Sequence, residues 1–397
     1  MSPVCQLAWI ALLMSIASAG QTQPDSPKTL PSALLTSSGH TEPNPPTPSP
    51  IPLLSPAWSN SYSLGTPPPE QWRRAMPAFS YDGSCIAIAG SSEAQVISRT
   101  GRTLWKWKFG AINRFIVAGS IAVSPACDAI ALGGDSSYKY VWIAEKNGHK
   151  ISLPFSSTPI GVAFSRDGKS VAVGTGSARL YLFTRDGKER WNTPPDSVSY
   201  PSDMSFSADG GFILIRECGA ILRVDGSIVG TYNGCGVSTS TDLRTIVTSW
   251  QPPHGPGPGH VTAQDETGKE IWSNFSDDPG GVITPDGETI VARVNIDQDP
   301  PGGETYEPRE TALRMFSRDG KKLDGFPNLD GRPAAVSPDG KTVLLETGRS
   351  LDAIDLKGKL LYSIAAFPYA YRIAPDFSAV VTFSRGSDAT LEYFKLK

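Results

Sequence analysis

One sequence pattern recurs eight times between residues 79 and 384, and it constrains the fold more than any other feature of the chain. Each copy holds an apolar residue, a small polar residue or alanine, a variable residue, an aspartate, usually a glycine, and then an apolar strand. The copies are FSYDGSCIAIAG (79–90), VSPACDAIALGG (123–134), FSRDGKSVAVGT (164–175), FSADGGFILIRE (206–217), TSTDLRTIVTSW (239–250), ITPDGETIVARV (283–294), VSPDGKTVLLET (336–347) and IAPDFSAVVTFS (373–384). The second copy reads with one extra residue before its aspartate, and the fifth begins with threonine. The aspartates that mark the register are Asp82, Asp128, Asp167, Asp209, Asp242, Asp286, Asp339 and Asp376.

The core of the repeat predicts a tight hairpin. Proline presets φ for a type I turn, aspartate bonds its own backbone, and glycine takes the left-handed position that follows. The strands after the turn are β-branched and apolar on both sides, as in residues 170–173, which fits a sheet covered on both faces. The repeat therefore predicts two paired strands, named a and b, joined by the turn.

A second turn signal follows in most copies and predicts strands c and d. It occurs in SRTGRTLW (98–105), EKNGHKI (145–151), TRDGKERW (184–191), RVDGSIV (223–229), DETGKEIW (265–272), SRDGKKL (317–323) and DLKGKLL (355–361). Repeats of about forty residues with four strands are typical of β-propeller blades. We therefore predict an all-β propeller of about eight four-stranded blades. An N-terminal strand, near residues 59–65, supplies the missing d strand and closes the ring. Seven blades is the alternative, because the copy with Asp242 lacks its glycine.

The repeats resemble two groups of propellers. Units such as SPDGKTVLLE are similar to the WD40-like repeats of periplasmic TolB-type propellers. The segment AQDETGKEIW (263–272) resembles the tryptophan motif of quinoprotein-like (PQQ-like) propellers, although most copies lack the tryptophan and the spacing between aspartate and glycine is one residue shorter. The resemblance covers about residues 71–397. It implies the architecture, and it implies that Trp105, Trp191 and Trp272 dock one blade on the next.

The N-terminal region predicts export. Residues 1–19 read as a signal peptide, with an apolar run at 7–16 and small residues at 17–19, although no Lys or Arg precedes the run. Residues 20–70 hold 13 of the 35 prolines and read as a disordered Pro/Ser/Thr-rich linker, either a stalk or an inert tail. Residues 71–397 form the propeller. We expect a secreted or periplasmic protein that is monomeric and has no transmembrane segment.

Four cysteines follow the signal peptide, and an exported chain permits disulfides. In a propeller the b–c and d–a connections share one face, and the a–b and c–d turns share the other. Cys218 and Cys235 fall on the first face of neighbouring blades, and Cys85 and Cys127 fall by turns on the second. We predict the pairs Cys218–Cys235 and Cys85–Cys127; four buried thiols are the alternative.

Signals for catalysis are few. No G-x-S-x-G, P-loop or dinucleotide-binding motif occurs, and no Cys/His spacing fits zinc. The net charge of -3 and the lack of a basic stripe argue against a nucleic-acid partner. We expect no resident cofactor, although Asp297 and Asp299 offer hard oxygen ligands that suit calcium.

Several long b–c and d–a connections fall on one face, and such insertions often mark the binding side of a propeller. The candidate binding residues on this face are Trp250, His254, His260, Asp277, Asp278, Tyr306, Asp330, Arg332, Tyr369 and Tyr371. We expect a non-catalytic module that binds a protein or a glycan through this loop-rich face. The alternative is an enzyme that uses the central mouth, such as a calcium-assisted lactonase or a quinone-dependent sugar or alcohol oxidoreductase. Carboxylates from several blades that converge on the axis would favour the enzyme.

Overall fold

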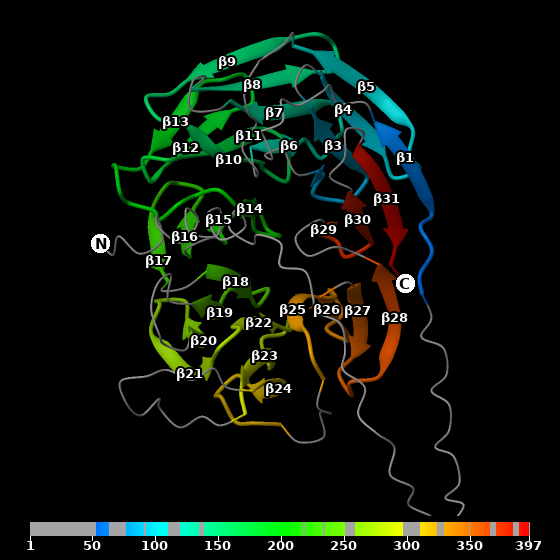
Figure 1. The fold of residues 1–397 in the computed structure, drawn as a ribbon. Coiled ribbons are helices and arrows are strands. Elements are labelled where there is room, and N and C mark those ends of the chain that lie inside the picture. Colours follow the sequence, from blue (N-terminus) through cyan, green and yellow to red (C-terminus); the bar gives the residue numbers. More distant parts are fainter. Residues whose placement is uncertain are drawn as a thin grey trace, which may run out of the picture.

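The computed structural model describes residues 53–62, 77–90, 93–109, 120–134, 139–216, 219–232, 235–250, 259–296, 310–323, 329–348, 350–365, 371–383 and 389–396. Every regular element in these ranges is a β-strand, and these ranges contain no helix of the length and apolarity needed to cross a membrane. The strands form eight separate sheets arranged around a ring (Figure 1). The fold is therefore an eight-bladed propeller, as predicted, and the seven-bladed alternative is wrong.

The blades are numbered in chain order. Blade 1 contains β2 (Ala78–Phe79), β3 (Cys85–Ala89), β4 (Glu93–Ser98) and β5 (Thr103–Lys108). Blade 2 contains β6 (Ile121–Val123), β7 (Ala129–Gly133), β8 (Tyr140–Glu145) and β9 (Lys150–Pro154). Blade 3 contains β10 (Pro159–Phe164), β11 (Ser170–Thr175), β12 (Arg179–Thr184) and β13 (Glu189–Asn192). Blade 4 contains β14 (Met204–Phe206), β15 (Phe212–Ile215), β16 (Ala220–Arg223) and β17 (Ile228–Thr231).

The second half of the ring repeats this order. Blade 5 contains β18 (Cys235–Thr239), β19 (Thr245–Trp250), β20 (Gly259–Asp265) and β21 (Glu270–Ser276). Blade 6 contains β22 (Gly280–Ile283), β23 (Thr289–Asn295) and β24 (Thr311–Ser317). Blade 7 contains β25 (Arg332–Val336), β26 (Thr342–Thr347), β27 (Ser350–Asp355) and β28 (Leu360–Ala365). Blade 8 contains β29 (Tyr371–Ile373), β30 (Ala379–Phe383), β31 (Ala389–Lys395) and β1 (Trp58–Tyr62).

Each blade is an antiparallel sheet whose first strand lies innermost in the ring (Figure 1). In blade 6 the place of the fourth strand is taken by a bridge between Phe316 and Lys322 and by a bond from Leu323 N to Met315 O of 2.9 Å. The a–b and c–d turns lie at one end of every blade, which we call the turn face. The b–c and d–a connections lie at the other end, which we call the loop face.

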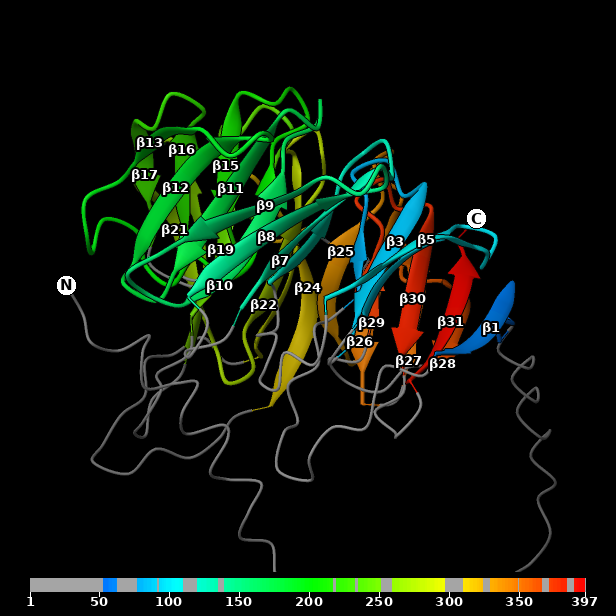
Figure 2. The same cartoon turned by 90° about the horizontal axis from the view of Figure 1, so that it is seen from above.

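The N-terminal strand closes the ring. β1 pairs antiparallel with β31, Trp58 opposite Tyr393, and the two strands lie side by side in both views (Figures 1 and 2). The Trp58 and Tyr393 rings stack with centroids 5.4 Å apart, and Trp58 Nε1 donates to Arg99 O of blade 1 at 2.8 Å. Upstream, Leu54 N bonds Ser363 O of blade 7 at 2.8 Å. The folded domain therefore reaches back into the range 20–70 that the sequence assigned to a linker.

The a–b turns explain why the repeat has its sequence. In blade 3, Ser165 Oγ donates to Asp167 Oδ1 at 2.6 Å, and the same oxygen accepts from Lys169 N at 3.0 Å. Gly168 N closes the turn on Ser165 O at 2.9 Å, with φ of +68°. The Ser165 hydroxyl bond is the main cause that holds the pKa of Asp167 below its usual value. Serine, aspartate and glycine thus satisfy the turn without help from other blades.

Three turns place a side chain where the others have glycine. Cys127, Leu243 and Phe377 have φ of 59°, 60° and 58°. The second copy therefore has no extra residue, because Cys127 takes the glycine position and Asp128 follows it. A left-handed non-glycine residue costs roughly 1–2 kcal/mol. Each of the three offsets this cost by a contact to the preceding blade: Leu243 and Phe377 pack against the buried clusters there, and Cys127 is bonded to Cys85.

Every junction between neighbouring blades has its own cluster of buried apolar side chains, eight clusters for eight junctions. The cluster between blades 8 and 1 joins Tyr62 of β1 to Ile86 and Ile88 of β3. Burial of apolar surface is the dominant favourable term in folding. The ring is therefore closed by packing as well as by strand pairing.

Tryptophans of the outer strands dock on the next blade, as the tryptophan motif implied. Trp105 Nε1 donates to Cys127 O at 2.7 Å, and Trp191 Nε1 donates to Val224 O at 2.8 Å. Trp272 lies on Gly320 of blade 6, where a Cβ would stand 2.6 Å from the ring. The glycine of this c–d turn therefore provides both a positive φ and the space for the indole.

A disulfide links blades 1 and 2 on the turn face. Cys85 and Cys127 are bonded, with Cα atoms 6.0 Å apart, which is the pairing that the topology predicted. The second predicted pair involves Cys218, which lies outside the described residues, and so it stays a prediction.

Candidate binding face

The loop face gathers most of the predicted binding residues that the structure describes. Strand a begins and strand b ends on this face. Trp250, Asp277, Asp278, Asp330 and Tyr371 all lie at such strand ends or in d–a connections, and His260 and Arg332 lie beside them. The other predicted residues are outside the described ranges: His254, Asp297, Asp299, Tyr306 and Tyr369.

Two of the predicted carboxylates converge on one guanidinium. Arg293, on β23, lies 3.2 Å from Asp278 Oδ2 and 3.0 Å from Asp330 Oδ1, and its Nε donates to Thr311 Oγ1 at 2.8 Å. Asp278 belongs to the connection between blades 5 and 6, and Asp330 to that between blades 6 and 7. The arginine side chain is 18% exposed, whereas the Asp278 and Asp330 side chains are 49% and 86% exposed, so solvent screens the carboxylate ends of both pairs. Arg293 thus fixes two connections of the loop face relative to each other.

Asp277 is held in a different way. Its backbone N donates to Asn295 Oδ1 at 2.9 Å, and Asn295 Nδ2 donates to Asp277 Oδ1 at 3.3 Å. Neighbouring Asp277 and Asp278 therefore point to different partners. Among the predicted acidic groups that the structure describes, Asp277 is therefore separated in its bonding from Asp278 and Asp330.

An aromatic row borders the loop face on blade 5. Trp250, His260 and Phe275 are cross-strand neighbours, with ring centroids 5.9 Å apart for the first pair and 4.9 Å for the second. Burial lowers the pKa of His260, and the charge of Glu270 acts against this shift. The histidine is therefore neutral at pH 7 and is part of an apolar row.

Tyr371 and Arg332 are both neighbours of Glu346 on blade 7, one through a hydrogen bond and the other through the strand register. Tyr371 Oη donates to Glu346 Oε2 at 3.0 Å. Burial, and then the charge of Glu346, raise the pKa of Tyr371, so the phenol stays protonated. Arg332 lies opposite Glu346 in the strand register, and its stem covers Gly280 of blade 6.

Sequence reasoning missed Arg293, which organises this face. The signal was present, because an arginine stands within the apolar strand ITPDGETIVARV. Charged residues are rarely buried unless they are paired, so such an arginine predicts a carboxylate partner. Its two partners come from separate blades, and the sequence alone does not identify them.

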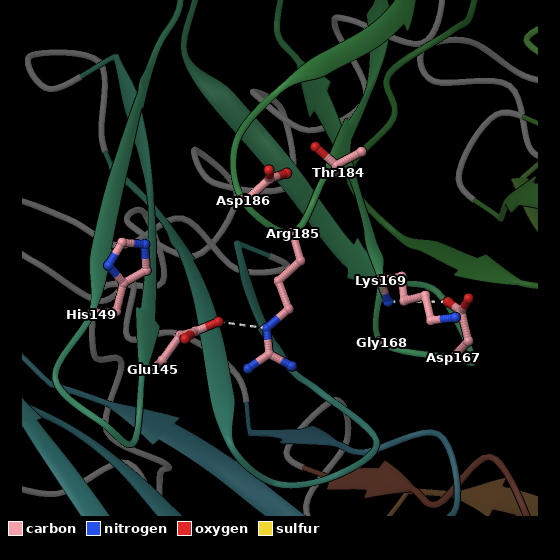
Figure 3. Close-up of a pocket in the computed structure, with 8 residues that line it drawn as sticks. All are labelled: Glu145, His149, Asp167, Gly168, Lys169, Thr184, Arg185 and Asp186. Atoms are coloured by element: carbon pink, nitrogen blue, oxygen red, sulfur yellow. Dashed lines mark hydrogen bonds and ion pairs between the residues drawn. The ribbon is translucent and has the colours of Figure 1, made fainter.

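The turn face carries a second charged cluster, also missed. Arg185 Nε lies 2.7 Å from Glu145 Oε1, and Arg185 Nη1 lies 3.0 Å from Asp128 Oδ1, so blade 3 is tied to blade 2. An open hollow of about 430 Å³ lies beside it, and Asp167, Lys169 and other turn residues line this hollow (Figure 3). These acidic groups already hold turns or the guanidinium. We therefore treat the cluster as a blade junction.

The described acidic side chains of the loop face are possible metal ligands. Within the described ranges, no group of three or more His, Cys, Asp or Glu side chains is arranged to hold a metal ion. Of the loop-face carboxylates described above, Asp278 and Asp330 pair with Arg293, Asp277 bonds Asn295, and Glu346 accepts from Tyr371. Such an arrangement suits recognition by shape and charge.

Comparisons with known proteins give the fold. No family model matches the chain, and no curated protein matches it. The WD40 domain at the C-terminus of Sif2 has a TM-score of 0.56 and 12% identity, over 87% of this chain and 99% of that domain. The Dos1 propeller has a TM-score of 0.55 and 13% identity, over 86% of this chain and 95% of that one. A chain of the Kuenenia stuttgartiensis hydrazine synthase is more distant, with a TM-score of 0.47 and 14% identity, over 84% of this chain and 97% of that one. The ring of eight blades and the first two likenesses show that this chain has the β-propeller fold of WD40 domains.

Proposed function

We propose that this protein is an exported, non-catalytic β-propeller that binds a protein partner through its loop face. The fold supports this proposal, because it is shared with WD40 domains, and rigid propellers offer wide surfaces for partners. We further propose that its repeats are of the TolB and quinoprotein-like type, which the tryptophan contacts between blades support.

The observation that carries the proposal is the convergence of Asp278 and Asp330 on Arg293. An enzyme of the central mouth needs carboxylates that are available to a metal ion or a reacting group. Here two carboxylates from different connections are both paired with one arginine. Their use is to hold the connections in place, and a preorganised surface loses less entropy when a partner binds.

Export is supported by two features. The N-terminal run at 7–16 has the pattern of a signal peptide. The disulfide between Cys85 and Cys127 is of a kind that persists in oxidising compartments and is rare in the cytosol. Both are compatible with a periplasmic or extracellular site of action.

The test is binding by matched charge reversals on the two faces. The mature chain, residues 20–397, is used to capture a partner from a cell-envelope or secreted fraction, and the affinity of the isolated partner is then measured by calorimetry. Asp330→Lys removes the ion pair between Asp330 and Arg293 on the loop face. Glu288→Lys makes the same charge change in an exposed turn of blade 6. We expect at least a tenfold loss of affinity, about 1.4 kcal/mol, for Asp330→Lys, because the new cation lies beside Arg293 and repels it, and we expect no loss for Glu288→Lys. Equal effects of the two variants, or an effect of Glu288→Lys alone, would contradict the proposal.

A further inference from the structure

Blade 2 differs from most of the other blades at its a–b turn. Most copies of the repeat have glycine at the left-handed position of this turn, whereas in blade 2 Cys127 takes the position with φ of 59°. A left-handed backbone is unfavourable for a residue that has a Cβ atom. The sulfur of Cys127 is bonded to Cys85 of blade 1, which is fully buried. The disulfide therefore holds the turn of blade 2 in a conformation that cysteine itself does not favour.

The residue after Cys127 depends on this conformation. In blade 3 the aspartate of the repeat precedes the glycine and bonds the backbone of its own turn. In blade 2, Asp128 follows Cys127, and Asp128 Oδ1 lies 3.0 Å from Arg185 Nη1 of blade 3. The backbone O of Asp128 accepts from Lys146 N at 2.8 Å, next to Glu145, which is the second partner of Arg185 (Figure 3). Both carboxylates that hold Arg185 are therefore tied to the turn that contains Cys127.

Cys127 is the more accessible half of the disulfide. It is half-buried on the turn face, with its sulfur 3.1 Å from Ser84 Oγ, whereas Cys85 belongs to the apolar cluster between blades 1 and 2. Exposed disulfides are the labile and regulatory ones. In thiol–disulfide exchange, a dithiol attacks the Cys127 sulfur, Cys85 leaves and takes up a proton, and the second thiol then releases Cys127. Two electrons pass to the cysteines, and the dithiol becomes a disulfide.

We propose that the Cys85–Cys127 disulfide is a redox-sensitive switch that controls the ion pairs of Arg185. In the oxidised chain, Cys127 stays left-handed and Asp128 stays beside Arg185. Reduction by a dithiol frees Cys127 to adopt a right-handed or extended backbone, which turns Asp128 away and exposes Arg185 at the turn-face hollow. The switch lies on the opposite face of the ring from the loop face, so it goes beyond the proposed function and does not depend on it.

The test measures how fast phenylglyoxal modifies Arg185 in the mature chain, before and after treatment with dithiothreitol, by peptide mapping. Arg293 is the internal control, because it also holds two carboxylates and is 18% exposed against 24% for Arg185, but it lies in blade 6. We expect reduction to raise the labelling rate of Arg185 by about fivefold or more, the factor that corresponds to the cost of one left-handed residue. The rate for Arg293 should not change.

Two variants separate the turn conformation from the cross-link. Cys85→Ala breaks the disulfide and leaves a free cysteine at the left-handed position, and we expect fast labelling of Arg185 without any reductant. Cys85→Ala/Cys127→Gly also lacks the cross-link, but glycine suits the left-handed position. We therefore expect this double variant to keep the slow labelling of the oxidised chain. Neither variant requires reduction, so the result does not depend on other disulfides.

Four results would overturn this inference. The first two are equal labelling of Arg185 in the oxidised and reduced chains, and a disulfide that dithiothreitol leaves intact in the folded chain. Faster labelling of both Arg185 and Arg293 after reduction would show general unfolding instead of a local change. Fast labelling in Cys85→Ala/Cys127→Gly would assign the effect to the cross-link alone and reject the role of the turn. If Cys85→Ala does not fold, the wild-type chain with and without reductant decides.

Discussion

The junction between blades 1 and 2 and the junction between blades 4 and 5 are built from the same repeat, yet they pack very differently. The first holds eleven buried apolar residues, among them Val96, Ile130 and Leu132. The second holds four: Leu214, Ile221, Tyr232 and Ile246. Since each buried aliphatic side chain contributes roughly 1.5–3 kcal/mol, the junction between blades 4 and 5 has much the smaller apolar contribution.

The cause lies on the face of blade 5 that points toward blade 4. Thr248, Thr262 and Gln264 share this face with Ile246, whereas the matching face of blade 2 carries Ile130 and Leu132. Gln264 Nε2 donates to Thr248 Oγ1 at 3.0 Å, and both side chains are buried. A buried hydrogen bond adds less net stability than the apolar contact that it replaces. The turns fix the architecture of each blade, and the residues of strands b and c fix how strongly blades hold together.

Both pairs of blades contain two cysteines in their sequences. Cys85–Cys127 joins blades 1 and 2 on the turn face. In the sequence, Cys218 stands between β15 and β16 of blade 4 and Cys235 begins β18 of blade 5, and the apolar cluster between these blades is small. A bond between them would strengthen the junction that packing leaves weakest.

The largest expected effect comes from these disulfides. The loop closed by Cys85–Cys127 spans 42 residues, for which the chain-entropy model gives about 4 kcal/mol. We expect the Cys85→Ser/Cys127→Ser protein to lose about this much free energy of unfolding in urea, and the Cys218→Ser/Cys235→Ser protein to lose about 3 kcal/mol because its loop is shorter. Peptide mapping without reductant would recover both linked pairs. Free thiols at Cys218 and Cys235 would show that the predicted disulfide between them is not formed, and the comparison of the two disulfides would then not apply.

A smaller effect is expected from the buried polar pair of blade 5. Thr248→Val leaves the Gln264 amide without its acceptor, which costs about 1–3 kcal/mol. Gln264→Leu in the same chain removes the orphaned donor, and we expect the double variant to recover most of the loss. Urea denaturation of the two singles and the double gives the coupling energy. A double variant less stable than Thr248→Val would mean that the pair stabilises the junction.

The pH dependence near neutrality tests the same side of blade 5. The pKa of His260 is below 6.5 in the folded chain, so the unfolded chain takes up its proton more readily. Its contribution to stability is therefore complete above pH 6.5 and falls as the pH drops below that value. The turn aspartates have pKa values below 3.8, so their contribution is lost only in more acidic solution. We expect the melting temperature to fall between pH 7.5 and 5.5, and this fall to shrink in His260→Phe but not in His149→Gln.

Calcium is expected to have the smallest effect. Calcium takes about six to eight oxygen ligands, and Asp278 and Asp330 already hold Arg293. Asp297 and Asp299 alone are too few. Scanning calorimetry should give the same melting temperature with calcium and with EDTA. Suppose instead that calcium raises the melting temperature and that Asp297→Ala or Asp299→Ala abolishes this increase. That result would favour the enzyme alternative.

The repeat predicted most of the fold because its signals are local. Ser165, Asp167 and Gly168 form these bonds within four residues, and the sequence displays all three. Even the Cys85–Cys127 pair followed from counting blades. Leu243 in the glycine position left seven blades as an alternative, because its compensation comes from another blade.

The candidate site was less predictable because its partners are distant in sequence. Asp278, Asp330 and Tyr371 were placed on the correct face from the order of strands and connections. Their bonds to Arg293 and Glu346 depend on the rotation of each blade about the ring, and no local signal encodes that rotation.

Hydrogen exchange followed by mass spectrometry tests the central claim most directly, that the ring is closed at all eight junctions and is weakest between blades 4 and 5. Local opening free energies follow buried apolar contacts. We predict slow exchange in β1 and β31, slowest exchange at β3 and β7, and fastest exchange among the central strands at β15, β16 and β19. Fast exchange in β1 and β31 would show that the N-terminal strand does not close the ring, and equal protection at both junctions would contradict the difference between them.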